Sequence, residues 1–84
     1  MKLAHTTLTL YSRRGCHLCE DMQAQLQEFV EEHSLKLEIH DIDQEPKLYD
    51  LYNTLVPVLC VGEVQVCHYF LDLASLKKTL GLLK

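Results

Sequence analysis

Residues 8–19, LTLYSRRGCHLC, contain the most informative pattern of this chain. Residues 8–11 favour a short strand, and residues 12–15 favour a loop. An amphipathic segment begins at Cys16, which places this cysteine at a helix N-terminus. Exposed backbone N–H groups and the helix dipole favour negative charge there, and the thiolate is the reactive form of cysteine. The pattern predicts a nucleophilic Cys16 with a second thiol, Cys19, one turn further along the helix.

Hydrophobic periodicity predicts two helices and a strand in the next part of the chain. Apolar residues recur at helical spacing from Cys16 to about Glu32 without an intervening Gly or Pro. Residues 35–40 alternate between apolar and polar, which is typical of a half-buried strand at a sheet edge. Since a long helix joins this strand to the first one, the two strands should be parallel. A short second helix opens at residues 43–46, with its proline in a tolerated first-turn position, and runs through Tyr52.

The last third of the chain predicts a hairpin and a final helix. Residues 55–61 are almost wholly apolar, as expected for a central strand buried on both faces. Gly62 and Glu63 favour a turn, after which residues 64–68 return as the antiparallel partner. Asp72 is a plausible N-cap. The helix after it carries four leucines: Leu73, Leu76, Leu80 and Leu83. The order βαβαββα predicts one α/β domain over residues 1–84.

Composition narrows the class of protein and the compartment. The formal net charge of the 84 residues is −4, which argues against nucleic-acid binding because phosphate contacts need a basic face. We expect no membrane association, because the apolar stretches are far too short to cross a bilayer. The start of the chain has no long apolar signal region, so a cytoplasmic location is expected. Paired cysteines in that reducing compartment are more often catalytic or metal-binding than structural. Nothing in the sequence requires more than a monomer.

The element order and three local features resemble glutaredoxins of the thioredoxin superfamily. The Cys16-His17-Leu18-Cys19 motif opens the first helix, and Leu55-Val56-Pro57 precedes the third strand, where glutaredoxins have Thr-Val-Pro with a cis proline facing the cysteines. Arg13 stands three residues before the first cysteine, where glutaredoxins carry Lys or Arg. The resemblance implies a thioredoxin-like fold, with a four-stranded mixed sheet and helices on both faces.

Two positions depart from the glutaredoxin pattern. The proline that usually follows the first cysteine is His17 in this chain. The Gly-Gly-x-Asp region that helps to hold glutathione is replaced by Cys67-His68-Tyr69-Phe70. The resemblance implies no bound cofactor and glutathione as a possible co-substrate, and the second departure leaves open whether glutathione binds.

The chemistry and the resemblance together predict a small thiol–disulfide oxidoreductase with a role in cell redox homeostasis. Cys16 would attack a protein disulfide or a glutathione mixed disulfide, and Cys19 would then resolve the adduct. A thiol reductant would have to restore the dithiol.

Four other residues are candidates for substrate binding. Arg13 would attract an anion, either the charge on Cys16 or a glutathione carboxylate, and His17 would share a proton with Cys16. By resemblance, Pro57 would lie against the cysteines, and the backbone of Val56 would pair with an extended substrate.

Other uses of the same cysteines stay open at this point. The fold could serve as a binding module without turnover, or as a carrier of zinc or an iron–sulfur cluster. A zinc site usually takes four ligands, but the remaining cysteines, Cys60 and Cys67, are widely separated in sequence. We therefore assign no metal ligand. Cys60 is expected to be a packed core thiol, and Cys67 either packs in the same way or acts as a third redox thiol.

Overall fold

The computed structural model describes residues 6–82, which form one four-stranded mixed sheet and three α-helices. The elements in chain order are β1 (Thr7–Ser12), α1 (His17–His33), β2 (Lys36–Asp41), the 3₁₀ turn η2 (Ile42–Gln44), α2 (Pro46–Tyr52), β3 (Val58–Val61), β4 (Val64–His68) and α3 (Leu73–Thr79). The strand order is β2-β1-β3-β4, with β1 and β2 parallel and the other two pairs antiparallel. This confirms the predicted βαβαββα order, the parallel first pair, the edge position of the second strand and the hairpin.

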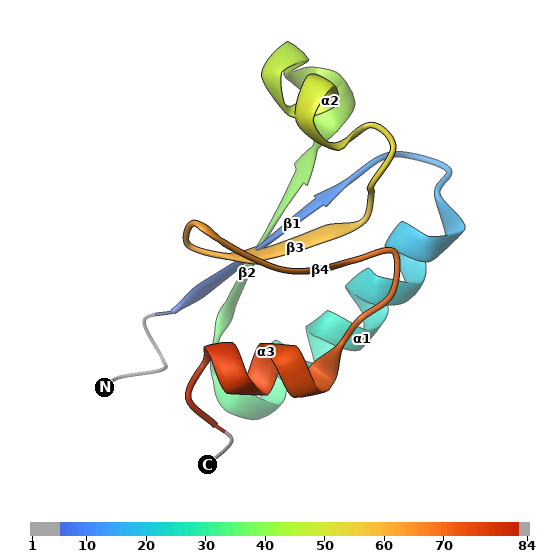
Figure 1. The fold of residues 1–84 in the computed structure, drawn as a ribbon. Helices are drawn as coiled ribbons and strands as arrows, with labels where there is room; N and C mark the ends of the chain where they lie inside the picture. Colours follow the sequence, from blue (N-terminus) through green and yellow to red (C-terminus); the bar gives the residue numbers. More distant parts are fainter. Residues whose placement is uncertain (1–5, 83–84) are drawn as a thin grey trace.

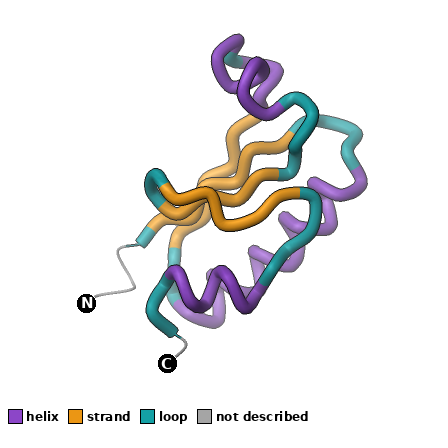
Figure 2. The backbone as a smooth tube through the Cα atoms, viewed as in Figure 1, coloured by secondary structure: helices purple, strands orange, loops and turns teal. Residues whose placement is uncertain are grey.

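Helices α1 and α3 cover one face of the sheet, and α2 lies beyond one end of the strands (Figure 1). The tube in Figure 2 shows the same separation between the two lower helices and the small upper one. The buried core between the sheet and the lower helices consists of Leu8, Leu10, Met22, Leu26, Phe29, Val30, Leu35, Leu59, Leu76 and Leu80. Leu8 and Leu10 alternate with outward-facing residues of β1, as side chains of a strand must.

The side chains of β1 that alternate with Leu8 and Leu10 project to the opposite face of the sheet. Tyr11 of β1 stacks on Tyr52 of α2 with the ring centroids 4.7 Å apart. Its neighbours across the strands, His40 and Val58, belong to the same face because paired residues project to the same side. Helix α2 therefore contacts the second face through Tyr52, although none of its own residues is buried.

The apolar stripe of α1 explains why this segment is helical and how it docks. Its buried residues are Cys19, Met22, Leu26, Phe29 and Val30. This spacing places them on the one side that faces the sheet. The helix ends at Ser34, which adopts a left-handed conformation with φ 57° and donates its N–H to Val30 O.

The third strand is shorter than the sequence predicted. The apolar run begins at Leu55, but β3 begins only at Val58. The N–H groups of Leu55 and Val56 both donate to Tyr52 O, at 2.9 and 3.1 Å, and Pro57 has no N–H to donate to a neighbouring strand. The part of the apolar run that forms β3 is central in the sheet and buried on both faces, as predicted. Val58 and Leu59 are fully buried, and Cys60 is 6% exposed.

The last helix follows the predicted N-cap. The side chain of Asp72 accepts a hydrogen bond from Ser75 N at 3.0 Å. Leu76 and Leu80 are buried, whereas Leu73 is 45% exposed at the start of α3. Leu83, the fourth leucine of the predicted stripe, lies outside the described residues.

Candidate active site

Cys16 is the N-cap residue of α1. Its backbone is extended, with φ −99° and ψ 110°, and its Sγ accepts a hydrogen bond from Cys19 N at 3.2 Å. Gly15, immediately before it, has φ 71°, a left-handed conformation that suits glycine and turns the chain from the loop into the helix. Cys16 as a whole is partly exposed to solvent. A partly accessible sulfur at the positive end of a helix is the arrangement in which a thiolate is favoured.

Cys19 lies one turn into the helix and is only 2% exposed. Burial, together with a hydrogen bond between its thiol and that of Cys16, raises the pKa of Cys19 to about 12. A backbone hydrogen bond from Arg13 acts in the opposite direction on this pKa. The two cysteines predicted to act as a pair therefore lie together and in different surroundings: one sulfur accessible, the other covered and protonated at neutral pH.

A pocket of about 270 Å³ reaches Cys19 from the side of the β1–α1 loop. Arg13, Arg14 and Gly15 form part of its wall, together with Asp41 at the end of β2. The pocket is a route by which solvent can approach Cys19.

The Val56–Pro57 peptide bond is cis, as the resemblance implied. The ring of Pro57 is fully buried, and the residue's carbonyl accepts a hydrogen bond from Tyr69 N at 2.9 Å. The N–H of Val56 is already bonded to Tyr52 O, so a substrate strand would have to use the Val56 carbonyl. Contact of Pro57 with the cysteines and pairing of Val56 with a substrate stay predictions.

The guanidinium of Arg13 pairs with the carboxylate of Asp43, a contact that the sequence did not predict. Its Nη2 and Nε donate to the two carboxylate oxygens of Asp43 at 2.9 and 3.2 Å, and its guanidinium carbon lies 5.4 Å from the centre of the Tyr49 ring. This side-chain hydrogen bonding with Asp43 raises the pKa of Arg13 above its usual value. Binding of a glutathione carboxylate by Arg13 would have to compete with Asp43.

His17 is exposed on the first turn of α1. Its imidazole makes no hydrogen bond to another residue in the range 6–82. The predicted proton exchange between His17 and Cys16 therefore stays a prediction.

The two remaining cysteines lie in the sheet. Cys60 is buried on the face that carries Tyr11, opposite the main core, and Cys67 is half-buried against that core. Burial raises the pKa of both thiols. These positions confirm packing for Cys60 and favour packing for Cys67.

Sequence reasoning did not assign a role to Tyr69 and Phe70. They line a pocket of about 380 Å³ together with Leu18, which lies between the two cysteines in sequence. The signal was present in the sequence, since two large aromatic residues stand between a predicted strand and a predicted N-cap, a position that is usually a polar turn.

Across residues 6–82, no cluster of three or more His, Cys, Asp or Glu side chains is placed to hold a metal ion. None of the helices in this range combines the length and the apolar character needed to span a bilayer.

Solved structures from several organisms share this fold. A solution NMR structure of protein Ne2328 from Nitrosomonas europaea is 42% identical, with a TM-score of 0.78 over 89% of this chain and 91% of that one. The X-ray structure of protein XcR50 from X. campestris is 28% identical, with a TM-score of 0.66 over 92% and 99% of the two chains. The thioredoxin of Fasciola hepatica is 16% identical, with a TM-score of 0.62 over 99% and 85%, and this likeness concerns the fold alone.

The sequence itself matches a family model. The model of the Glutaredoxin-like domain (DUF836) covers residues 7–81, and the search of curated proteins gave no significant match. The match extends from the first strand to the end of the last helix, so it includes both cysteines of α1 and the cis proline. This chain therefore belongs to the glutaredoxin-like domain family, within the thioredoxin superfamily.

Proposed function

We propose that the chain is a small thiol–disulfide oxidoreductase in which Cys16 is the nucleophile and Cys19 the resolving thiol. The observation that carries this proposal is the hydrogen bond from Cys19 N to Cys16 Sγ at 3.2 Å, made at the N-cap of α1 by a partly exposed sulfur. A backbone N–H donor and the helix dipole stabilise the thiolate more than the thiol, because both act on the negative charge.

The first step is an exchange at the substrate disulfide. The Cys16 thiolate attacks one sulfur of the disulfide, the bond between Cys16 and that sulfur forms, and the original sulfur–sulfur bond breaks. The departing half leaves as a thiolate and takes a proton from water. The substrate sulfur that remains is held in a mixed disulfide with Cys16.

The second step closes the disulfide of the protein and releases the rest of the substrate. Cys19 loses its proton to water and attacks the sulfur of Cys16, which forms the Cys16–Cys19 disulfide and releases the second half of the substrate as a thiolate. The substrate has then gained two electrons and the protein has lost two. Two thiols or one dithiol from outside must reduce the protein disulfide before another cycle, as expected in a reducing compartment such as the cytoplasm.

The experiment uses purified reduced protein and a peptide disulfide. Cys16→Ser should abolish release of the peptide thiol, whereas Cys19→Ser should still release one half and retain the other on Cys16, as intact-protein mass spectrometry would show. Cys67→Ser is the matched control, because Cys67 lies outside the α1 pair, and it should react like the unmodified chain. Equal residual reactivity of the Cys16→Ser and Cys19→Ser variants would contradict the proposal and favour a module that binds without turnover.

A further inference from the structure

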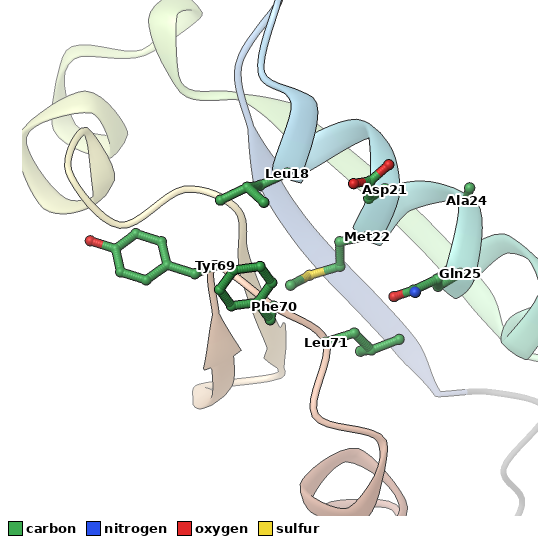
Figure 3. A pocket seen from close by; sticks show the side chains of 8 residues that line it. All are labelled: Leu18, Asp21, Met22, Ala24, Gln25, Tyr69, Phe70 and Leu71. Carbon is green, nitrogen blue, oxygen red and sulfur yellow. The ribbon is translucent and has the colours of Figure 1, made fainter.

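A pocket beside the cysteine pair has no role in the two exchange steps. It measures about 380 Å³ and lies between α1 and the segment that links β4 to α3. Figure 3 shows Leu18 and Met22 of α1 on one side and Tyr69, Phe70 and Leu71 of the linking segment on the other. We call this site the aromatic pocket. Its volume lies at the small end of the range for ligand sites, which suits a side chain rather than a whole cofactor.

The lining combines a buried floor with exposed aromatic walls. Met22 is 1% exposed and closes the bottom, whereas Phe70 is 69% exposed and Tyr69 is 40% exposed. Large aromatic side chains that are exposed together and rest on a packed base are typical of contact surfaces, because they offer much apolar area with little loss of conformational freedom.

Tyr69 is held in place at both ends. Its Oη donates to Thr54 O at 2.6 Å, and its backbone N–H donates to Pro57 O at 2.9 Å. Its backbone has φ 66°, a left-handed conformation that is uncommon for a bulky residue. These contacts fix the aromatic segment to the loop of the cis proline, so the pocket keeps a constant position relative to that loop.

The charge of the pocket is negative. Asp21 is the one ionisable acid or base among the described lining residues apart from the phenol of Tyr69, and its carboxylate has no ion-pair or hydrogen-bond partner within residues 6–82. Glutathione carries two carboxylates and one ammonium group, so Asp21 disfavours it. Arg13, which could offset this, is engaged by Asp43. A cationic partner fits better than an anionic one.

The pocket also reaches the first turn of α1, which carries the reacting pair. Leu18 lies between Cys16 and Cys19 on the first turn of α1 and lines the pocket. A polypeptide joined to Cys16 by a mixed disulfide would therefore place residues close to its own cysteine over Leu18 and Phe70.

We propose that the aromatic pocket receives an apolar side chain of a protein substrate while Asp21 pairs with an adjacent Lys or Arg. This inference rests on the proposed function and names its substrate class: disulfides of apolar, basic polypeptide segments, in preference to glutathione disulfides. Exposed aromatic residues in the region where glutaredoxins carry Gly-Gly-x-Asp would thus favour a different substrate class.

The test compares three disulfide-linked peptide dimers that differ in two positions. They are built from acetyl-Cys-Ala-Leu-Lys-amide, acetyl-Cys-Ala-Leu-Glu-amide and acetyl-Cys-Ala-Ser-Lys-amide, so the residue next to the reacting cysteine is the same in all three. The second-order rate constant for reduction by the reduced protein should be about tenfold higher for the Leu-Lys peptide than for either of the others, as expected for one buried leucine or one close charge pair. Oxidised glutathione should react more slowly than the Leu-Lys peptide.

Two variants and two matched controls assign the selectivity to the pocket. Phe70→Ala should remove the preference for Leu over Ser, and Asp21→Asn should remove the preference for Lys over Glu. Leu51→Ala changes another strongly exposed apolar residue, and Asp50→Asn changes another exposed carboxylate, both on α2. Both controls should keep the full selectivity. Circular dichroism would verify that each variant is folded.

A binding measurement separates this inference from the proposed function. The variant with both Cys16→Ser and Cys19→Ser should bind the S-methylated Leu-Lys peptide more tightly than the other two, as measured by fluorescence anisotropy. Selective binding without any disulfide reduction by the native chain would leave the pocket assignment standing and overturn the proposed function. Equal rates and equal binding for all three peptides, or a selectivity that survives Phe70→Ala and Asp21→Asn, would overturn the inference.

Discussion

The backbone N–H of Cys19 donates a hydrogen bond to the sulfur of Cys16, 3.2 Å away, while the sulfur of Cys19 itself lies buried beneath the first turn. Cys19 thus gives a backbone hydrogen bond to the sulfur of Cys16, while burial raises the pKa of its own thiol. Under the proposed function, this geometry gives the two cysteines different roles: the more exposed Cys16 would attack first, and the buried Cys19 would act when the adduct has formed.

The order of alkylation should follow this difference. With limiting iodoacetamide at neutral pH, Cys16 should be modified first, because it is partly exposed, whereas Cys19 and Cys60 are buried. Cys19, with a pKa of about 12, and the buried Cys60 should remain unmodified. Peptide mapping by mass spectrometry measures the order. Modification of Cys19 before Cys16 would reverse the assigned roles.

Closure of the disulfide ring should depend steeply on pH. Burial is the largest cause that raises the pKa of Cys19, and it does not depend on the Cys16 thiol, so in the adduct too the Cys19 thiol should be protonated at neutral pH and its thiolate fraction should grow as pH rises. The rate of the second step should increase about tenfold per pH unit between about pH 7 and about pH 9.

The measurement starts from the Cys67→Ser chain treated with Ellman's reagent. A first release of thionitrobenzoate reports attack by Cys16, and a slower second release reports closure by Cys19. Cys19→Ser should lose the second release. A closure rate that is flat over this pH range would show that another group removes the proton of Cys19.

Freeing Arg13 should change the preference for anionic substrates. Asp43→Asn removes the carboxylate that binds the guanidinium in a bidentate pair. The variant should reduce a glutathione mixed disulfide several-fold faster than the native chain at low salt, and the gain should vanish with added salt. Asp50→Asn controls for the change in net charge. No gain in Asp43→Asn would show that Arg13 does not reach an anion at Cys16.

The protein should lose stability when a buried side chain of α1 is truncated and leaves a cavity in the core. Leu26→Ala removes a fully buried side chain of α1 and should lower the free energy of unfolding by about 2–5 kcal/mol. Gln23→Ala, an exposed position on the same helix, should change it by no more than about 0.5 kcal/mol. Urea denaturation followed by circular dichroism gives both values. Equal losses in the two variants would mean that α1 does not pack against the sheet as described.

The sequence predicted those features that depend on local patterns. The strand–loop–helix order before Cys16 was sufficient to place it at a helix start, and alternation over residues 35–40 was sufficient to place an edge strand. The apolar run of residues 55–61 correctly indicated a central strand but gave it too early a start, because hydrogen bonds from Leu55 and Val56 back to Tyr52 keep this segment out of the sheet. The resemblance, which placed Leu55-Val56-Pro57 ahead of the strand, is confirmed.

The features that sequence reasoning missed depend on contacts between distant segments. Arg13 and Asp43 are thirty positions apart, and nothing in the local pattern shows that they meet. Tyr69 reaches Thr54 across fifteen positions, and this contact, together with the bond from Tyr69 N to Pro57 O, ties the aromatic segment to the loop before β3. Such pairs are determined by how the elements pack, so a single sequence read by periodicity does not reveal them.

The most direct test of the central claim is the equilibrium of the native chain with glutathione buffers of increasing oxidised fraction, quenched with acid and analysed by mass spectrometry. We predict the loss of two hydrogen atoms at one cooperative transition, with the new bond mapped to Cys16 and Cys19. Thiols that remain reduced across all ratios, or a bond that involves Cys60 or Cys67 instead, would contradict the account.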